Sequence, residues 1–263
     1  MKRVLALMLA IAMVASLAIL TGCGNEDAKK ATANETTNEN KTYVIYSDNA
    51  FAPFEYLDEE TNVYVGVDMD LLAAIAEDQG IKYEMHNEGF DASMGAVQSG
   101  QADAMIAGMT IKPEREETFD FSNGYFEDGQ VLVVKKDSDI KEFTDLKGKT
   151  VACKTSTAGG DFAESIKEQY GFTINYYEGS NEMYQAVLNG VDSACFEDFS
   201  VIGWAIKQGG TDLSIVSEVV NSAPYGFAVK KGTNAELIEK FNKGLENIKA
   251  SGKYKEILAK YGY

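Results

Sequence analysis

The sequence predicts an α/β fold built from two similar lobes, and three observations support this prediction. From Thr42 onward, apolar runs of strand length alternate with segments of helical periodicity. The same order of strands and helices occurs twice along the chain. Two further extended apolar runs, Gly129–Lys136 and Tyr225–Lys231, follow the first and second copies. We interpret these two runs as crossover strands that join the lobes.

The first copy forms a βαβαβ unit. A buried strand is predicted at Tyr43–Ser47, and a helix over Asp68–Asp78, where apolar residues recur at helical spacing before a glycine. Alternation of apolar and polar residues predicts the next strand at Ile81–Met85. A short helix at Asp91–Ser99 and a strand at Ala104–Ala107 complete the unit.

The second copy repeats this order. Its predicted elements, in turn, are a strand, a helix, a strand, a helix and a strand at Val151–Lys154, Asp161–Tyr170, Ile174–Tyr177, Ser180–Asn189 and Ser193–Phe196.

The chain ends in a helical tail over residues 232–263, whose apolar stripe can return to cover the first lobe. Lobe 1 is therefore expected to comprise residues 42–130 and 226–263. Lobe 2 is expected to comprise residues 131–225.

An export signal precedes the lobes. Two basic residues come before the apolar run Val4–Leu20, which is shorter than the roughly 20 residues that a membrane-spanning helix needs. A cleaved signal peptide over residues 1–22 is therefore favoured over a permanent anchor helix. The segment Leu20-Thr21-Gly22-Cys23 resembles the lipobox of bacterial lipoproteins, in which Cys23 would carry the lipid (palmitate) and become the first mature residue.

Residues 23–41 are expected to form the lipidated cysteine and a flexible tether, because residues 24–40 contain no aromatic residue and no aliphatic residue larger than alanine. The whole chain has 41 acidic and 24 basic residues, a formal charge of −17. This sign is wrong for a protein that binds phosphate backbones, so nucleic acid is not expected as a partner.

The two remaining cysteines, Cys153 and Cys195, lie in apolar runs of strand length. An exported protein can form a disulfide between them, and two buried free thiols are the alternative. The sequence leaves this choice open.

The residues that follow each predicted strand mark the place for a ligand, since open α/β sheets bind ligands beyond the carboxyl ends of their strands. These residues include aromatic rings, hydroxyls, carboxylates and free backbone amides, which suit a small zwitterion. They are Asp48, Phe51, Phe90, Gly108-Met109-Thr110, residues 155–160, Glu197 and Asp198.

Signals for catalysis or for a cofactor are missing from the sequence. The single histidine, His86, is predicted on the outward face of a strand, so a catalytic triad and a histidine zinc site lack their usual residues. The pair Gly159-Gly160 lacks the ending of a phosphate-binding loop. No cofactor and no metal are expected.

Residues 42–263 resemble the extracellular solute-binding proteins of the polar amino acid group, the ligand-capturing components of ABC importers, and are similar to glutamine-binding members. This resemblance implies the type II periplasmic-binding fold. The motifs that carry it are Phe51-Ala52-Pro53-Phe54-Glu55, Gly66-Val67-Asp68-Met69-Asp70, GQADAMIAGMTIKPER at residues 100–115, Phe119-Asp120-Phe121-Ser122 with Tyr125, and Asp145-Leu146-Lys147-Gly148-Lys149.

The resemblance implies a residue for each end of an amino acid. Arg115 would pair with the α-carboxylate, with help from Thr110 and from backbone amides near Thr157 and Ala158, because a guanidinium fork matches a carboxylate and helix N-termini bind anions. The alternative role of Arg115 is a surface ion pair with a neighbouring glutamate.

For the α-ammonium, Glu197 takes the position where the family usually has aspartate, and Asp198 is the alternative partner. Phe51 and Phe90 would enclose the ligand side chain, and Asp48 would contact the side chain or the ammonium group. The alternatives are core packing for the two rings and a turn cap for Asp48. Gly108 is expected to line the same cleft.

Lys154 bears on specificity. A fixed positive charge disfavours lysine and arginine as ligands, which points to a polar side chain such as that of glutamine or glutamate. Phe196 stands where close glutamine-binding relatives carry histidine, and cystine stays an alternative ligand.

Together these observations predict a monomeric, lipid-anchored receptor on the outer face of the bacterial cell membrane. It would close on a polar amino acid, glutamine being favoured, and deliver it to an ABC permease. The alternatives are a periplasmic-type dehydratase on the same fold, since fold alone does not determine function, and a ligand-sensing module of a receptor.

Overall fold

The computed structural model describes residues 41–263. They form an α/β fold with two large sheets, each of which contains both parallel and antiparallel strand pairs. The predicted signal peptide, lipidated Cys23 and tether fall on residues 1–40, outside the described residues. Within the described part, no helix is long and apolar enough to span a membrane.

The first sheet has five strands, with β1 parallel to β5 and β6, and β14 antiparallel to β6 and β7. Both faces are covered, which explains why β1 and β6 are largely apolar, whereas the edge strand β5 is mostly polar. In sheet order the strands are β5 (Lys82–Glu88), β1 (Thr42–Asp48), β6 (Ala104–Met105), β14 (Ala228–Lys230) and β7 (Phe119–Phe121).

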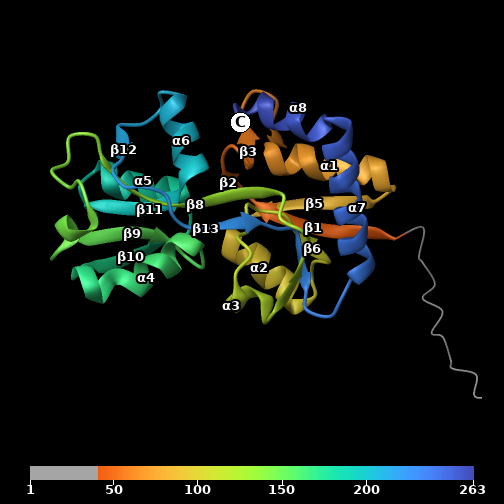
Figure 1. Cartoon of the computed structure of the whole chain (residues 1–263), viewed down its shortest axis with the longest axis horizontal. Coiled ribbons are helices and arrows are strands. Elements are labelled where there is room, and N and C mark those ends of the chain that lie inside the picture. The colour runs from red at the N-terminus through yellow and green to blue at the C-terminus, as the bar shows by residue number, and fades with distance from the viewer. Residues whose placement is uncertain (1–40) are drawn as a thin grey trace, which may run out of the picture. The chain divides into compact units, whose positions relative to one another are not determined.

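Helices pack on both faces of this sheet (Figure 1). The two helices of the C-terminal tail share one apolar core with α1, as the apolar stripe predicts, and α2 packs on the other face. The bounds are α1 (Val67–Gln79), α2 (Phe90–Ser99), α3 (Pro113–Glu116), α7 (Ala235–Ser251) and α8 (Lys253–Lys260).

The second sheet has six strands and is also covered on both faces. In sheet order these are β10 (Thr173–Tyr177), β9 (Thr150–Lys154), β11 (Ala194–Asp198), β8 (Phe126–Lys135) and β12 (Leu213–Ile215), with β13 (Val220–Tyr225) also paired to β8. One face carries α4 (Ala158–Tyr170) and the short 3₁₀ helix η1 (Phe143–Leu146), and the other carries α5 (Ser180–Leu188) and α6 (Phe199–Lys207).

The chain passes between the two sheets at slightly different places than the sequence predicts. The run Gly129–Lys136 lies almost wholly in β8, inside the second sheet, and the passage occurs just before it, after β7. The run Tyr225–Lys231 is divided, because Tyr225 ends β13 in the second sheet and Ala228 begins β14 in the first. An apolar extended run does not reveal which sheet it joins.

The two cysteines are buried and free. Cys153 packs with the α4 side of the second sheet and Cys195 with the α5 side, because the residues belong to separate apolar cores on opposite faces. Opposite faces prevent a disulfide between them. Burial raises the pKa of the Cys153 thiol to about 12, so it stays a neutral, inert side chain.

A small antiparallel sheet joins two of the sequence motifs beside the first sheet. It consists of β2 (Ala50–Phe51), β3 (Glu55–Asp58) and β4 (Val63–Val65). The amide of Val67 donates to the carbonyl of Pro53 at 2.9 Å, and that of Asp68 donates to the carbonyl of Phe54 at 3.0 Å. Gly66 makes this approach possible, since a Cβ there would lie 2.0 Å from the Phe54 oxygen.

We expect Gly66→Ala to lower the free energy of unfolding by roughly 2–4 kcal/mol. Its φ of +140° is strained for any side chain, and the added methyl collides with backbone. For a domain of this size the melting temperature should fall by about 4–16 °C in a thermal unfolding experiment.

The matched control is Gly95→Ala, which lies exposed inside α2 with open space around its Cα. That change should stabilise the protein by up to about 1 kcal/mol, because alanine loses less backbone entropy in a helix. Equal melting temperatures for the two variants would contradict the role assigned to Gly66.

Candidate functional site

One cavity collects all ten residues that the sequence analysis predicts as ligand contacts. It lies between the two sheets, at the carboxyl ends of β1, β6, β9 and β11. The ten predicted residues that line it are Asp48, Phe51, Phe90, Gly108, Thr110, Arg115, Lys154, Thr157, Ala158 and Glu197.

Arg115 is a buried cation in this cavity, with 6% of its surface exposed. Helix α3 places it there, and its two terminal nitrogens donate to the carbonyls of Thr110 (2.8 Å) and Ser156 (2.9 Å). These contacts use two of the five N–H groups of a guanidinium. Burial lowers its pKa to about 10, so the group stays charged at neutral pH. The surface ion pair considered for Arg115 does not form.

The N-terminus of α4 opens onto the same cavity. Thr157 is the N-cap, and its hydroxyl accepts from the Gly160 amide at 3.2 Å and donates to the Lys154 carbonyl at 2.8 Å. The first amides of a 13-residue helix favour an anion beside them. Arg115 and this helix end therefore make one side of the cavity positive.

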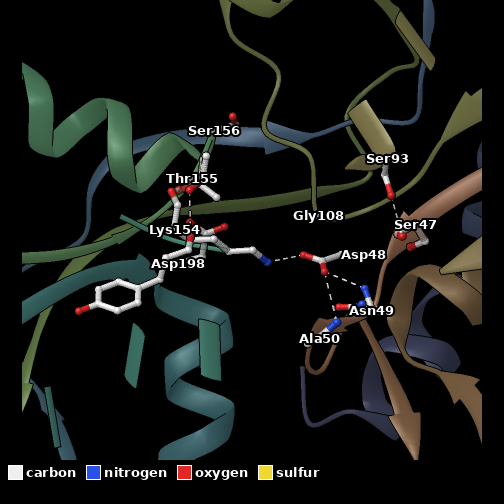
Figure 2. Close-up of polar contacts among 12 residues, drawn as sticks. Ser47, Asp48, Asn49, Ala50, Ser93, Gly108, Lys154, Thr155, Ser156 and Asp198 are labelled. Atoms are coloured by element: carbon white, nitrogen blue, oxygen red, sulfur yellow. Dashed lines mark hydrogen bonds and ion pairs between the residues drawn. The ribbon is translucent and has the colours of Figure 1, made fainter. Parts of the chain in front are cut away.

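Asp48 and Lys154 form an ion pair across the cavity, from the end of β1 in one sheet to the end of β9 in the other (Figure 2). Only 2% of Asp48 and 4% of Lys154 is exposed. The ammonium of Lys154 lies 5.3 Å from the centre of the Phe51 ring and 5.9 Å from that of Phe90. Asp48 also accepts from the Asn49 amide at 2.7 Å, so its turn-capping role is real as well.

Glu197 and Asp198 make another wall negative. Glu197 accepts from the Tyr184 hydroxyl at 2.6 Å and from the Asp198 amide at 2.9 Å, while Asp198 accepts from the Gln130 side chain and the Tyr225 hydroxyl. Burial raises the pKa of both carboxyl groups, and their mutual repulsion adds to the rise for Glu197. A cationic group in the cavity would relieve this repulsion.

Gly108 has a backbone role that its place after β6 did not reveal. Its φ of +51° brings it against Phe51, where a Cβ would lie 2.4 Å from the ring. Its amide donates to Asp68 at 2.8 Å. That amide is therefore already hydrogen-bonded. Gly108 contributes to the cavity by letting the backbone lie against the Phe51 ring.

Gln130 and Ala107 also line the cavity and were missed by sequence reasoning, whereas Gly159 lies within the expected segment 155–160. The Oε1 atom of Gln130 is buried and has no partner among the described residues. Gly159 allows α4 to lie close to Gln130, because a Cβ there would lie 2.8 Å from that oxygen. The signal for Gln130 was its position as a polar residue in the apolar crossover run.

Three contacts beside the cavity connect its two sides. Lys112 pairs with Asp161 of α4, and the Ser156 hydroxyl donates to Asp91 of α2 at 2.6 Å. The third is the contact of Arg115 with the Ser156 carbonyl. These bonds hold the two sheets together around the cavity.

The arrangement matches a small zwitterion. A carboxylate fits the side formed by Arg115 and α4, an ammonium group fits the side formed by Glu197 and Asp198, and aromatic rings flank the space between them. Within residues 41–263, no group of three or more His, Cys, Asp or Glu side chains could hold a metal ion.

Comparison with solved structures agrees with this fold. Substrate-binding domain 2 of GlnP from Lactococcus lactis, in an open conformation, is 41% identical, with a TM-score of 0.59 over 84% of this chain and 94% of that chain. The arginine-, lysine-, histidine-binding protein ArtJ from Geobacillus stearothermophilus is 36% identical, with a TM-score of 0.77 over 84% and 95%. The predicted type II periplasmic-binding fold is confirmed.

Sequence comparison leads to the family. The ABC transporter glutamine-binding protein GlnH from Bacillus subtilis is 29% identical over 99% of this chain and 97% of its own length. The model of the bacterial extracellular solute-binding proteins, family 3, matches residues 43–263. The chain therefore belongs to family 3 of the bacterial extracellular solute-binding proteins, and it is an amino acid-binding protein of the ABC transporter type.

Proposed function

We propose that the cavity binds one polar amino acid, with glutamine as the preferred ligand, and that the protein delivers it to an ABC permease. The observation that carries this proposal is the meeting of all ten expected residues at one cavity that is positive on one side and negative on another. The relatives are named as amino acid-binding proteins, which supports an amino acid ligand. Because they are named as binding proteins and not as enzymes, they also favour a receptor over the alternative dehydratase.

The proposed binding mode assigns each end of the ligand to one wall. The α-carboxylate binds Arg115, Thr110 and the amides of α4. The α-ammonium binds the carboxylates of Glu197 and Asp198, and the free oxygen of Gln130 offers it a further acceptor. The side chain then extends between Phe51 and Phe90 toward Asp48 and Lys154.

The Asp48–Lys154 pair supports glutamine among the ligands that the relatives bind. The ammonium of Lys154 lies 5.3 Å and 5.9 Å from the centres of the two rings, so a lysine or arginine side chain that extended between them would meet a like charge. A glutamate carboxylate would meet Asp48. A glutamine amide has both a donor for Asp48 and an acceptor for Lys154, so it satisfies both groups.

Closure of the two sheets on the ligand is part of the proposal. The open GlnP domain is more similar to this chain in sequence than ArtJ is, but its TM-score is lower. A different arrangement of the two halves in the open GlnP domain would explain the lower score. The three contacts beside the cavity, made by Lys112, Ser156 and Arg115, would then separate when the protein opens.

Export and anchoring complete the proposed function. The family description is extracellular, and we propose that residues 1–22 are removed and that Cys23 carries the lipid of a monomeric receptor. The permease would be its membrane partner.

We expect glutamine to raise the melting temperature of the soluble protein that begins at residue 24. At 100 times its dissociation constant a ligand stabilises the fold by about 2.7 kcal/mol, which corresponds to roughly 5–11 °C at this size. Thermal unfolding with and without each common amino acid and cystine measures this shift.

Arg115→Ala should weaken binding by about 2–5 kcal/mol, because the buried ligand carboxylate loses its charged partner. Isothermal titration with each amino acid and cystine measures this loss.

The control for this experiment is Lys141→Ala, which removes an exposed cation that does not line the cavity. Its binding should equal that of the wild type. Arg115→Ala binding within twofold of wild type would refute the assigned role, and no shift with any amino acid would refute the function.

We expect Lys154→Gln to change which ligands bind. Loss of the ammonium leaves Asp48 free to pair with a cationic side chain, so arginine or lysine should become measurable ligands. Glutamine should bind at least tenfold more weakly, about 1.4 kcal/mol, because a charged hydrogen bond is lost. Competition titrations of glutamine, glutamate, arginine and lysine test this.

Lys112→Gln is the matched control for Lys154→Gln, because it makes the same change in an ion pair whose residues do not line the cavity. The order of ligand preference should be unchanged in that variant. The specificity role of Lys154 would be wrong if both variants kept the wild-type order.

A further inference from the structure

Behind the ligand cavity, two carboxyl groups lie together with no cation bound to either. Glu55 in β3 and Asp68 in α1 are both completely buried, with 0% of their surface exposed. The backbone contacts between the two motifs, which Gly66 permits, bring the carboxyl groups within hydrogen-bonding reach of each other.

The hydrogen bonds around this pair are incomplete when both groups are ionised. One oxygen of Asp68 accepts from the Gly108 amide at 2.8 Å and from the Tyr125 hydroxyl at 2.7 Å. The other Asp68 oxygen and both Glu55 oxygens have no donor among the described residues. Two buried carboxylates in contact would repel each other and lack hydrogen bonds, which is strongly unfavourable.

A single proton resolves both problems, because a carboxylic acid can donate to the neighbouring carboxylate. Asp68 already has two donors, so it is the better anion, and Glu55 is the better acid. The other charged or titratable groups that face Glu55 are Asp48, Lys154 and Tyr125. Asp48 and Lys154 neutralise each other as an ion pair, and burial and the neighbouring carboxyl groups raise the pKa of Tyr125, so it stays a neutral donor to Asp68.

The direction of the pKa shifts agrees with this assignment. Burial and the charges of Asp68 and Asp48 raise the pKa of Glu55 well above its usual range, and Lys154 only partly offsets the rise. Burial raises the pKa of Asp68 to about 6, against the lowering effect of the Gly108 and Tyr125 hydrogen bonds.

We propose that Glu55 and Asp68 share one proton and that this acid–carboxylate pair positions the turn at Gly108 and Thr110 under the ligand cavity. The pair holds the Gly108 amide directly. Two residues later, the carbonyl of Thr110 holds the Arg115 guanidinium, so the pair also supports the cation that would bind the ligand. Glu55 is a positioning residue, since it lies behind the cavity and does not line it.

The proton can be tested without a ligand. Because the folded state keeps the Glu55 proton at pH values where the unfolded chain has lost it, the unfolding free energy should fall as pH rises above the ordinary carboxyl value near 4.5. Glu55 contributes a tenfold change in the unfolding equilibrium constant per pH unit, until its raised pKa is reached. Glu55→Gln keeps a donor for Asp68 but cannot titrate, so its slope should be shallower than that of the wild type by this one proton. The other buried carboxyl groups with raised pKa values, such as Asp68 and Glu197, contribute equally to both slopes.

The matched control is Glu60→Gln, the same change on an exposed side chain of the adjacent turn, which should retain the wild-type slope. Carbon-13 NMR of the glutamate carboxyl groups in the wild type gives a second measurement that needs no variant. The Glu55 signal should stay at its protonated position between pH 5 and 7 while the exposed glutamates are ionised. A Glu55 signal that titrates with the exposed groups would overturn the proposal, as would equal slopes for wild type and Glu55→Gln.

The positioning effect rests on the proposed function and has its own measurement. Glu55→Gln should bind glutamine within threefold of wild type at pH 7, because the amide still donates to Asp68. Glu55→Leu removes the donor and should bind at least tenfold more weakly. Equal affinities for these two variants would refute the positioning role. If the wild type bound no amino acid, the proposed function would fail while the result on the shared proton would stand.

Discussion

The ion pair between Asp48 and Lys154 is the constraint on which the site depends. Each charge comes from the end of a strand in a different sheet, and both are almost completely buried. Buried charges are stable only when paired, so this arrangement requires the two sheets to face each other closely. It also places a cation between two aromatic rings, at the place where the side chain of an amino acid would extend.

Backbone geometry supplies the rest of the cavity. Parallel strands end at one edge of a sheet, and helix α4 begins there, so carboxylates, hydroxyls and free amides gather without any long-range signal in the sequence. Glycines allow the close approaches: Gly108 lies against Phe51, and Gly159 lies against Gln130. Polar groups that would be costly to bury alone are paired with each other, as in Asp198 with Gln130 and Tyr225.

Most of the fold and of the site could be predicted from local patterns. The helix at Asp68–Asp78 and the strand at Tyr43–Ser47 follow from periodicity and agree with α1 and β1 within one or two residues. The site residues followed from their positions after strands and from motif resemblance. Gln130 was missed because its side chain reaches the cavity from within a strand, and the sheet of the crossover run at Gly129–Lys136 could not be assigned because pairing partners are not local.

The sequence by itself determined the class of the protein: alternating strands and helices in two copies, acidic composition, and motifs that place an arginine and carboxylates near strand ends. Tertiary structure decided which groups meet. Cys153 and Cys195 cannot pair because adjacent strands turn them to opposite faces, and Glu55 meets Asp68 because Gly66 lets two backbones touch. Such contacts depend on distances between segments far apart in the chain, and these distances exist only once the apolar cores have packed.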